Sequence, residues 1–284
     1  MNMLKIKNKK IISGAGFTII ELLVVIAIVG LLGSIVFVST RGSTDKAKIA
    51  KVLQYSASLH HLLGADIVGE WNFEESPDNN VNIYDTSGNN NNGTWTGTPE
   101  RVSNDASSQL GKAGKFDGTE YVRIEHSASL DMKEAITISV WVKPDTGPGY
   151  HVIACKGSFT YFFSTNSGRV ALLIGKADRS SWNIVVFGNT ALNNARWYHL
   201  VGTYKNGVGR VYVDGVEDRR LTGSNENIGS YTAWLSLGSA SSYYSGYYFN
   251  GIIDELRIYN LSLTSAEIQK LYAEGAEKHG LTVK

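Results

Sequence analysis

The sequence predicts a mainly β protein, in which a membrane-spanning α-helix precedes an antiparallel two-sheet sandwich with a short C-terminal helix. The first observation is an uncharged apolar run at residues 22–38. The second is a series of short alternating runs from Val68 onward, bounded by Gly, Asn, Asp and Ser clusters. The third is a capping-box motif at 264–267, which predicts a helix through about Ala273.

Composition and charge exclude several classes of protein. The chain has 284 residues, of which 43% are hydrophobic and 19% are charged, as expected for a folded protein rather than a disordered one. A formal net charge of +1 argues against nucleic acid as a partner. Cys155 is the only cysteine, so no intramolecular disulfide can form, and the core or a metal must hold the fold together.

The apolar run is long enough to span a bilayer. From Phe17 to Val38 the chain would form a helix of about 33 Å, against a hydrocarbon core of about 30 Å. Four lysines precede the run and only Arg41 follows it closely, so the positive-inside rule predicts a cytoplasmic N-terminus and an extracytoplasmic remainder. A secretory signal peptide is the main alternative, but the small residues 13–16 come before the run instead of after it.

A carboxylate inside the spanning segment from Phe17 to Val38 indicates a function. Glu21 would cost roughly 2.5–3.5 kcal/mol in the bilayer, so it is either an acid tolerated near the interface or a group that acquires a partner. The string GFTIIELLVVIAIVGLLGSIV resembles the N-terminal signature of type IV pilins and pseudopilins. The resemblance implies that prepilin peptidase cleaves between Gly16 and Phe17 and methylates the new amine. It also implies that Glu21 pairs with the amino group of a neighbouring subunit's Phe17 during assembly.

Seven runs downstream are typical of strands, and no long helical pattern interrupts them. Asp214 and Gly215 between two such runs predict a tight hairpin turn. Many short strands over about 200 residues favour a two-sheet antiparallel sandwich. The predicted strands are 136–143, 151–155, 169–175, 182–187, 197–204, 209–215 and 252–259.

The order of landmarks in this region resembles a known family. The segments GEWNFEE, YDTSGNNNNGT, KFDGTEYVRI, ITISVWVKP, WYHLVGTY, VYVDG, FNGIIDELRIYN and LTSAEIQKLY resemble the LamG-like, concanavalin A-like jelly roll from Gly69 to Tyr272. The resemblance implies the fold but not the function, because this fold is found in lectins, adhesins, hydrolases and spacers.

These patterns divide the chain into five segments. Apolar residues recur at helical spacing from Ile49 to Leu63, which extends the N-terminal helix as an amphipathic stretch. The segments are a leader peptide at 1–16, a transmembrane and amphipathic helix at 17–63, a linker at 64–68, the jelly-roll domain at 69–274 and a tail at 275–284.

A structural Ca²⁺ is the first candidate ligand of the β domain. The family often holds such an ion, and the turn after Tyr84 offers the Asp85 carboxylate together with free carbonyl oxygens, which suit a hard cation. The resemblance makes the first and last strands neighbours, which would bring Asp254 to the same place. The alternative is a solvated turn and an unrelated surface aspartate.

Glycan binding is the second candidate. Tyr243, Tyr244, Tyr247 and Tyr248 form an aromatic loop, and tyrosine offers a flat face and a hydroxyl at low entropic cost. A second loop, 145–150, could join it. The alternative is a loop that packs its rings over an edge of the sandwich.

Hydrolysis is the third candidate, and the sequence argues against an enzyme. Glu70, Asn72 and Glu74 alternate like the carboxylates of some jelly-roll glycosidases, but the middle residue is an amide. The two glutamates would lie about 13 Å apart on a regular strand, whereas hydrolysis needs carboxyl groups about 5–9.5 Å apart. Cys155 has no obvious helix-dipole or histidine context that would activate it.

The expected function is therefore a type IV pilin-like minor subunit or a pseudopilin that displays a LamG-like head with a glycan-binding role in adhesion. The expected partners are other pilin subunits, prepilin peptidase, the membrane and a polysaccharide. The protein would cross the cytoplasmic membrane once and reach a pilus or the cell surface after assembly. The alternative is a membrane-anchored adhesin or carbohydrate-active protein that is not part of a filament.

Overall fold

The computed structural model describes residues 64–103, 111–145, 147–240 and 247–281. The chain divides into two compact units, Met1–Gln54 and Tyr55–Lys284, and all described residues belong to the second. The predicted membrane helix and the residues Gly16, Phe17 and Glu21 lie outside the described residues. Within the described ranges, no helix has the length and apolar character needed to cross a bilayer.

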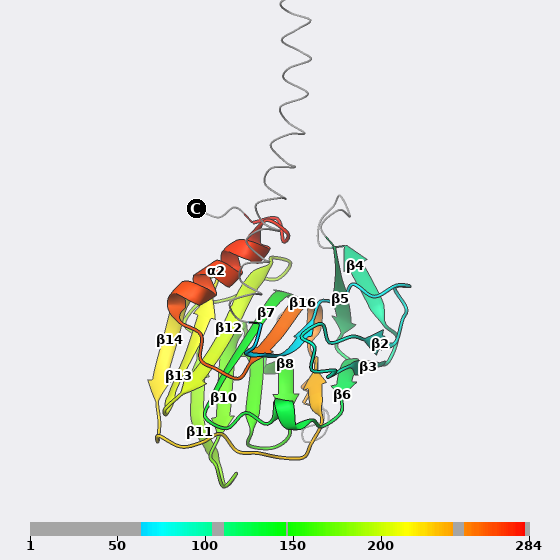
Figure 1. The fold of residues 1–284 in the computed structure, drawn as a ribbon. Coiled ribbons are helices and arrows are strands. Elements are labelled where there is room, and N and C mark those ends of the chain that lie inside the picture. The colour runs from blue at the N-terminus through cyan, green and yellow to red at the C-terminus, as the bar shows by residue number, and fades with distance from the viewer. Residues whose placement is uncertain (1–63, 104–110, 146, 241–246, 282–284) are drawn as a thin grey trace, which may run out of the picture. The chain divides into compact units, whose positions relative to one another are not determined.

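The described domain is the predicted antiparallel sandwich of two sheets (Figure 1). Sheet A contains, in spatial order, β14 (Val216–Thr222), β13 (Val208–Val213), β12 (Tyr198–Lys205), β7 (Ala135–Pro144), β16 (Asn250–Tyr259), β5 (Lys112–Asp117) and β4 (Glu100–Ser103), and β1 (Ile67–Trp71) also pairs with β16. Sheet B contains, in spatial order, β11 (Trp182–Phe187), β10 (Arg169–Gly175), β9 (Tyr161–Asn166), β8 (Tyr150–Lys156), β15 (Leu235–Leu237), β6 (Tyr121–Ile124), β3 (Gly93–Thr96) and β2 (Asn82–Ile83).

The main core fills the space between the two sheets. Alternate residues of each strand point inward, so a strand contributes every second side chain to it. Aromatic rings form one end of this core, where Trp95 stacks on Phe116 at 4.7 Å between centroids and Phe73 meets both edge-on. The free thiol of Cys155 is buried, so the described fold rests on packing rather than on covalent links.

The turn and helix signals of the sequence are confirmed. Asp214 and Gly215 adopt φ angles of 50° and 80° between β13 and β14, as a two-residue hairpin turn requires. The C-terminal helix α2 spans Ser265–Ala276. The Thr264 hydroxyl accepts from the Glu267 amide at 3.3 Å, and the Glu267 carboxylate accepts from the Thr264 amide at 2.7 Å. The helix is about one turn longer than predicted because its apolar face continues onto the sheet.

Helix α2 covers the outer face of sheet A across β12, β13 and β14 (Figure 1). Ile268 and Leu271 pack against Val201, Tyr212 and Tyr259, which point away from the main core. Helix and sheet approach closely at Gly275, where a Cβ atom would lie 2.2 Å from Nε1 of Trp141. A short helix η1 (Ala128–Leu130) precedes β7.

Candidate functional site

The outer face of sheet B is apolar where a solvated face would be polar. One face of an antiparallel sheet normally meets water and alternates with the buried face. In β9 and β10, however, consecutive residues are buried on both faces. Phe163 belongs to the main core, whereas its neighbour Phe162 belongs to a separate cluster on the outer face. Four strands, β8 to β11, contribute to this outer cluster.

Aromatic rings form the surface of the outer cluster. Tyr150 contacts Phe162 at 5.8 Å, Phe187 at 6.3 Å and Tyr247 at 5.6 Å between centroids. Trp182 meets Phe162 edge-on at 6.2 Å. We name these five residues, Tyr150, Phe162, Trp182, Phe187 and Tyr247, the aromatic platform.

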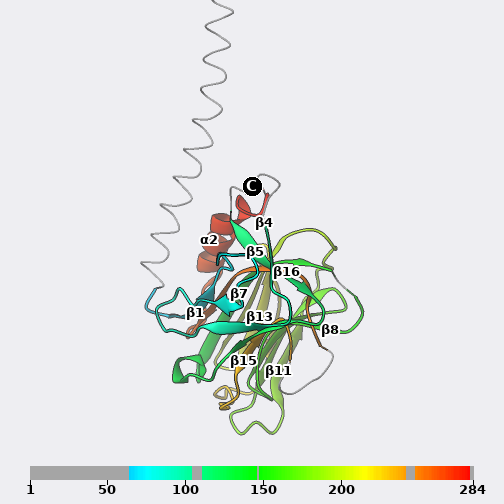
Figure 2. The same cartoon turned by 90° about the vertical axis from the view of Figure 1, so that its right-hand side faces the viewer.

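The aromatic platform is partly open to solvent. Phe162 is buried, and the other four rings are half-buried. Small or aliphatic side chains such as Val152, Ala171 and Leu173 lie beneath them. In both views α2 lies apart from β8 and β11, so the only described α-helix does not cover this face (Figures 1 and 2). The platform can therefore offer flat apolar surfaces to a ligand.

The predicted tyrosine loop lies partly in this platform. Tyr247 is one of its rings, and Tyr248 is half-buried beside it, whereas Tyr243 and Tyr244 lie outside the described residues. The amide of Val152 donates to the Tyr247 carbonyl at 3.4 Å. The loops 145–150 and 247–250 therefore lie together, as the sequence suggested, and the glycan-binding role of the tyrosines stays a prediction.

The predicted calcium ligand Asp85 organises its own turn. One carboxylate oxygen accepts from the amides of Glu70 and Ser87, each at 2.9 Å, and the other accepts from the Asn91 amide at 2.9 Å. The Trp71 indole donates to the Asn91 carbonyl at 3.0 Å, which fixes the same turn against the core. This carboxylate therefore joins β1 to the following loop.

The second predicted ligand, Asp254, lies in β16, which does pair with β1 as expected. It is fully buried, and its Oδ2 lies 3.0 Å from His279 Nε2 and 3.3 Å from Lys278 Nζ. Asp85 and Asp254 thus bind different groups: backbone amides in one case and the side chains of Lys278 and His279 in the other. The described residues contain no group of three or more metal-ligating side chains, and a structural Ca²⁺ stays a prediction.

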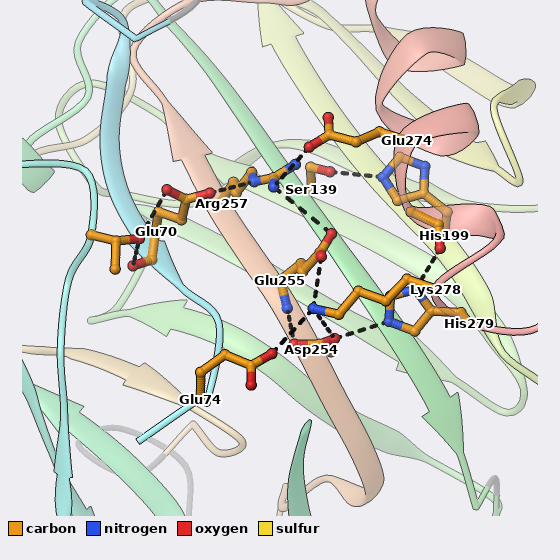
Figure 3. A network of polar contacts seen from close by, with 12 residues as sticks. Glu70, Glu74, Ser139, His199, Asp254, Glu255, Arg257, Glu274, Lys278 and His279 are labelled. Atoms are coloured by element: carbon orange, nitrogen blue, oxygen red, sulfur yellow. Dashed lines mark hydrogen bonds and ion pairs between the residues drawn. The ribbon is translucent and has the colours of Figure 1, made fainter. Parts of the chain in front are cut away.

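A network of charged side chains links β1 and β16 to the C-terminal segment (Figure 3). Arg257 lies between Glu70 at 2.7 Å and Glu274 at 3.5 Å. Lys278 pairs with Glu255 at 2.9 Å and, less closely, with Glu74 at 3.4 Å. These six residues and Asp254 connect three chain segments, so the network fixes the C-terminal segment to the sheet.

The network also sets the charge states of its members. Burial opposes ionisation of Glu255, but the Lys278 and Arg257 cations hold its pKa well below the ordinary value. Burial, followed by the Arg257 guanidinium, lowers the pKa of His199 to about 3. His199 is therefore neutral, and its Nε2 lies 2.8 Å from the Ser139 hydroxyl (Figure 3). Paired, buried groups of this kind hold structure together.

The two glutamates considered for hydrolysis do not alternate along one strand as predicted. β1 ends at Trp71, and Phe73 adopts a φ of 56°, so Glu70 and Glu74 do not lie on one regular strand. Both glutamates form ion pairs within the network. The Cys155 thiol is buried, and burial raises its pKa to about 12, so it stays protonated at neutral pH.

The sequence contains a signal for the platform that the strand predictions did not use. The runs YFFST, RVALLIG and WNIVVF are apolar at consecutive positions instead of alternate ones. In an antiparallel sheet this pattern indicates that both faces are covered or bind something. It points to Phe162, which lies in a strand that was not predicted, and to Trp182 and Phe187, which were expected only as strand residues.

A family model and solved structures are similar to this domain. A model described as the concanavalin A-like lectin/glucanases superfamily matches residues 116–269. Domain 4 of AbnA, an extracellular arabinanase from Geobacillus stearothermophilus, solved in complex with arabinotriose, is 24% identical with a TM-score of 0.57. That alignment covers 73% of this chain and 98% of the other. Comparison with curated protein sequences gives no match.

Two toxin domains share the fold. The binding domain of Paraclostridial Mosquitocidal Protein 1 and that of botulinum neurotoxin serotype G are each 14% identical, with TM-scores of 0.59 and 0.56. Each alignment covers 74% of this chain and about half of the toxin domain, 52% and 51%. Because the family model spans more than half of the 284 residues, the chain belongs to the concanavalin A-like lectin/glucanases superfamily.

Proposed function

We propose that the described domain binds carbohydrate on the aromatic platform. The observation that carries this proposal is the set of half-buried rings on a sheet face that would otherwise be polar. Sugar rings present apolar C–H faces that pack on aromatic side chains, while Tyr hydroxyls hydrogen-bond to sugar hydroxyls.

The structural comparisons support the same ligand class. The similar arabinanase domain was solved with arabinotriose. Another similar structure belongs to botulinum neurotoxin type C, whose cell entry is described as dependent on interaction with two ganglioside molecules. Both ligands contain sugars. We transfer to this chain only the ligand class, carbohydrate, and neither the particular sugar nor an enzymatic activity.

Binding of polysaccharides to full-length protein in detergent tests the proposal. In affinity electrophoresis with a panel of neutral and charged plant and bacterial polymers, the wild type should be retarded by at least one polymer. Tyr150→Ala and Phe187→Ala should each weaken that binding about tenfold or more, because each removes one stacking surface. Tyr84→Ala is the matched control, since Tyr84 is 51% exposed and lies outside the platform. Equal retardation of all three variants would refute the platform as the site.

We also propose that the chain displays this domain as a type IV pilin-like subunit, which is a second, compatible role. The support is in the sequence: the small residues before the apolar run and the carboxylate within it match the pilin signature. In this proposal, prepilin peptidase cuts after Gly16, and Glu21 pairs with a neighbour's Phe17 amine. The alternative is a membrane-anchored adhesin outside a filament.

Incorporation into filaments distinguishes the pilin-like subunit from the membrane-anchored adhesin. Glu21→Ala should abolish recovery of the protein in sheared surface filaments, because the neighbouring amine loses its buried partner. Ser34→Ala in the same apolar run is the control and should leave recovery unchanged. Unchanged recovery of Glu21→Ala, or a mature protein whose first residue is Met1, would contradict the pilin-like role.

A further inference from the structure

Two arginines from different sheets donate to backbone carbonyls at or next to Phe187, a residue of the aromatic platform. Arg169 begins β10, and Arg219 lies in β14. Arg169 Nη1 donates to the Asn189 carbonyl, and Arg219 Nη1 donates to the Phe187 carbonyl at 3.5 Å. These two carbonyls are separated by at most about 7 Å of backbone, so both guanidiniums lie near residues 187–189 at the end of β11.

Neither guanidinium has an acidic partner among the described residues. In contrast, Arg210 and Arg220, on the same pair of strands as Arg219, both pair with Glu217. The carboxylate of Asp218 also lies near residues 187–189, where it accepts hydrogen bonds from the loop after β11.

The Asp218 side chain holds the loop that follows β11. Its oxygens accept from the Asn189 amide at 2.6 Å and from the Thr190 hydroxyl at 2.7 Å. The strands β8 to β11 contain no Asp or Glu at all. These four strands thus bring no carboxylate to the platform, and neither arginine forms an ion pair within the described part of the chain.

We propose that the ligand of the platform is an anionic polysaccharide, with sugar rings on the aromatic side chains and an acidic group held by Arg169 and Arg219. This inference rests on the proposed carbohydrate binding. The planar guanidinium presents parallel N–H donors that match the oxygens of a carboxylate, and sulfate esters offer similar oxygens. A uronic acid or a sulfated sugar fits this chemistry, and a polyamine sugar such as chitosan does not.

Matched pairs of polymers that differ only in charge test the inference. Full-length protein in detergent is compared on polygalacturonate and its methyl ester, and on dextran sulfate and dextran. The expected result is binding at least tenfold tighter to the charged member of one pair, weakening as salt is raised. The pair that shows the preference distinguishes a carboxylate from a sulfate.

Variants connect the preference to the two arginines. The double variant Arg169→Gln/Arg219→Gln should lose the charge preference while it keeps the wild-type thermal unfolding midpoint. Arg220→Gln removes a neighbouring charge that already has the partner Glu217, so it should keep the preference.

Three outcomes would overturn the inference. Equal binding to charged and neutral polymers refutes it and leaves carbohydrate binding intact. A charge preference that survives in the folded double variant refutes the two arginines as the acidic subsite. Failure to bind any polymer of the panel refutes both this inference and the proposed function.

Discussion

The outer faces of the two sheets differ in what covers them. On sheet A, the chain's own C-terminal segment covers the face, with α2 packed on Tyr212 and Tyr259 and charged residues fixing its end. On sheet B, half-buried rings such as Tyr150 and Phe187 meet solvent, and no described helix packs over them. Similar apolar strands are thus covered by the chain itself on one side and partly open on the other, where we propose that a ligand binds.

The comparison shows how to separate structural from functional groups in this fold. The charged residues that fix the C-terminal segment to sheet A, such as Arg257 and Lys278, have carboxylate partners, so their loss should affect stability. Arg169 and Arg219, beside the platform of sheet B, have no acidic partner among the described residues, so their loss should affect binding. Substitutions in the sheet A network should therefore lower stability and leave ligand binding unchanged. Substitutions of the two arginines should weaken binding and leave stability unchanged.

The largest effect on stability is expected from Arg257, the centre of the sheet A network. Arg257→Ala leaves the buried carboxylates of Glu70 and Glu274 without their cation, which should cost about 3–5 kcal/mol of unfolding free energy. Arg220→Ala is the control, because its pair with Glu217 is exposed and should contribute less than about 1 kcal/mol. Urea unfolding measures both, and equal costs would contradict the structural role of the network.

Acid should destabilise the domain through His199. Its pKa is lowered to about 3 in the folded state, so below about pH 6.5 the unfolded chain takes up a proton that the folded chain does not. The stability due to neutral His199 is complete above pH 6.5 and declines as the pH falls towards 3. Between pH 6.5 and pH 4 the loss is about 3 kcal/mol. Thermal unfolding of His199→Gln should depend less steeply on pH than that of the wild type, and identical slopes would exclude this residue as the cause.

The next largest loss of stability is expected when the turn held by Asp85 is disrupted. Asp85→Ala leaves three backbone amides without their acceptor and should cost about 1–3 kcal/mol. Asp78→Ala, which removes an exposed ion pair with Lys112, should cost less. The same proteins test the proposed Ca²⁺: a site at Asp85 predicts that EDTA lowers the melting temperature of the wild type and not that of Asp85→Ala. If EDTA leaves the melting temperature of both proteins unchanged, Asp85 is excluded as a Ca²⁺ ligand.

The smallest effect is expected at the helix cap. Thr264→Ala removes the hydroxyl that accepts from the Glu267 amide and should cost about 1 kcal/mol. Thr264→Ser keeps the acceptor and should be close to the wild type. Carbohydrate binding should remain intact in both variants, because α2 lies on the other sheet. Weakened binding in Thr264→Ala at a temperature where it is folded would contradict the separation of the two faces.

Much of the fold could be predicted from local patterns. The hairpin at Asp214 and Gly215 and the capping box at Thr264 are set by residues next to each other in sequence, and both were predicted correctly. The strand β10 has the predicted bounds, Arg169–Gly175. The continuation of α2 to Ala276 was missed, because it depends on packing against residues far away in the chain, such as Trp141.

The candidate site was harder to predict for the same reason. The tyrosine loop pointed to Tyr247 and the loop 145–150 to Tyr150, but Phe187, which contacts Tyr150, comes from a strand whose pairing order the sequence does not state. Likewise, Asp254 was expected at a metal, whereas its partners Lys278 and His279 belong to a segment expected to be a tail. Both cases depend on contacts between residues distant in sequence.

Hydrogen–deuterium exchange locates the bound ligand most directly. Full-length protein is compared with and without the polymer that retards it most strongly in electrophoresis. Binding on the aromatic platform should slow exchange in β8 and β11, around Tyr150 and Phe187, and leave exchange in α2 unchanged. Protection confined to α2 and sheet A, with β8 and β11 unchanged, would contradict it.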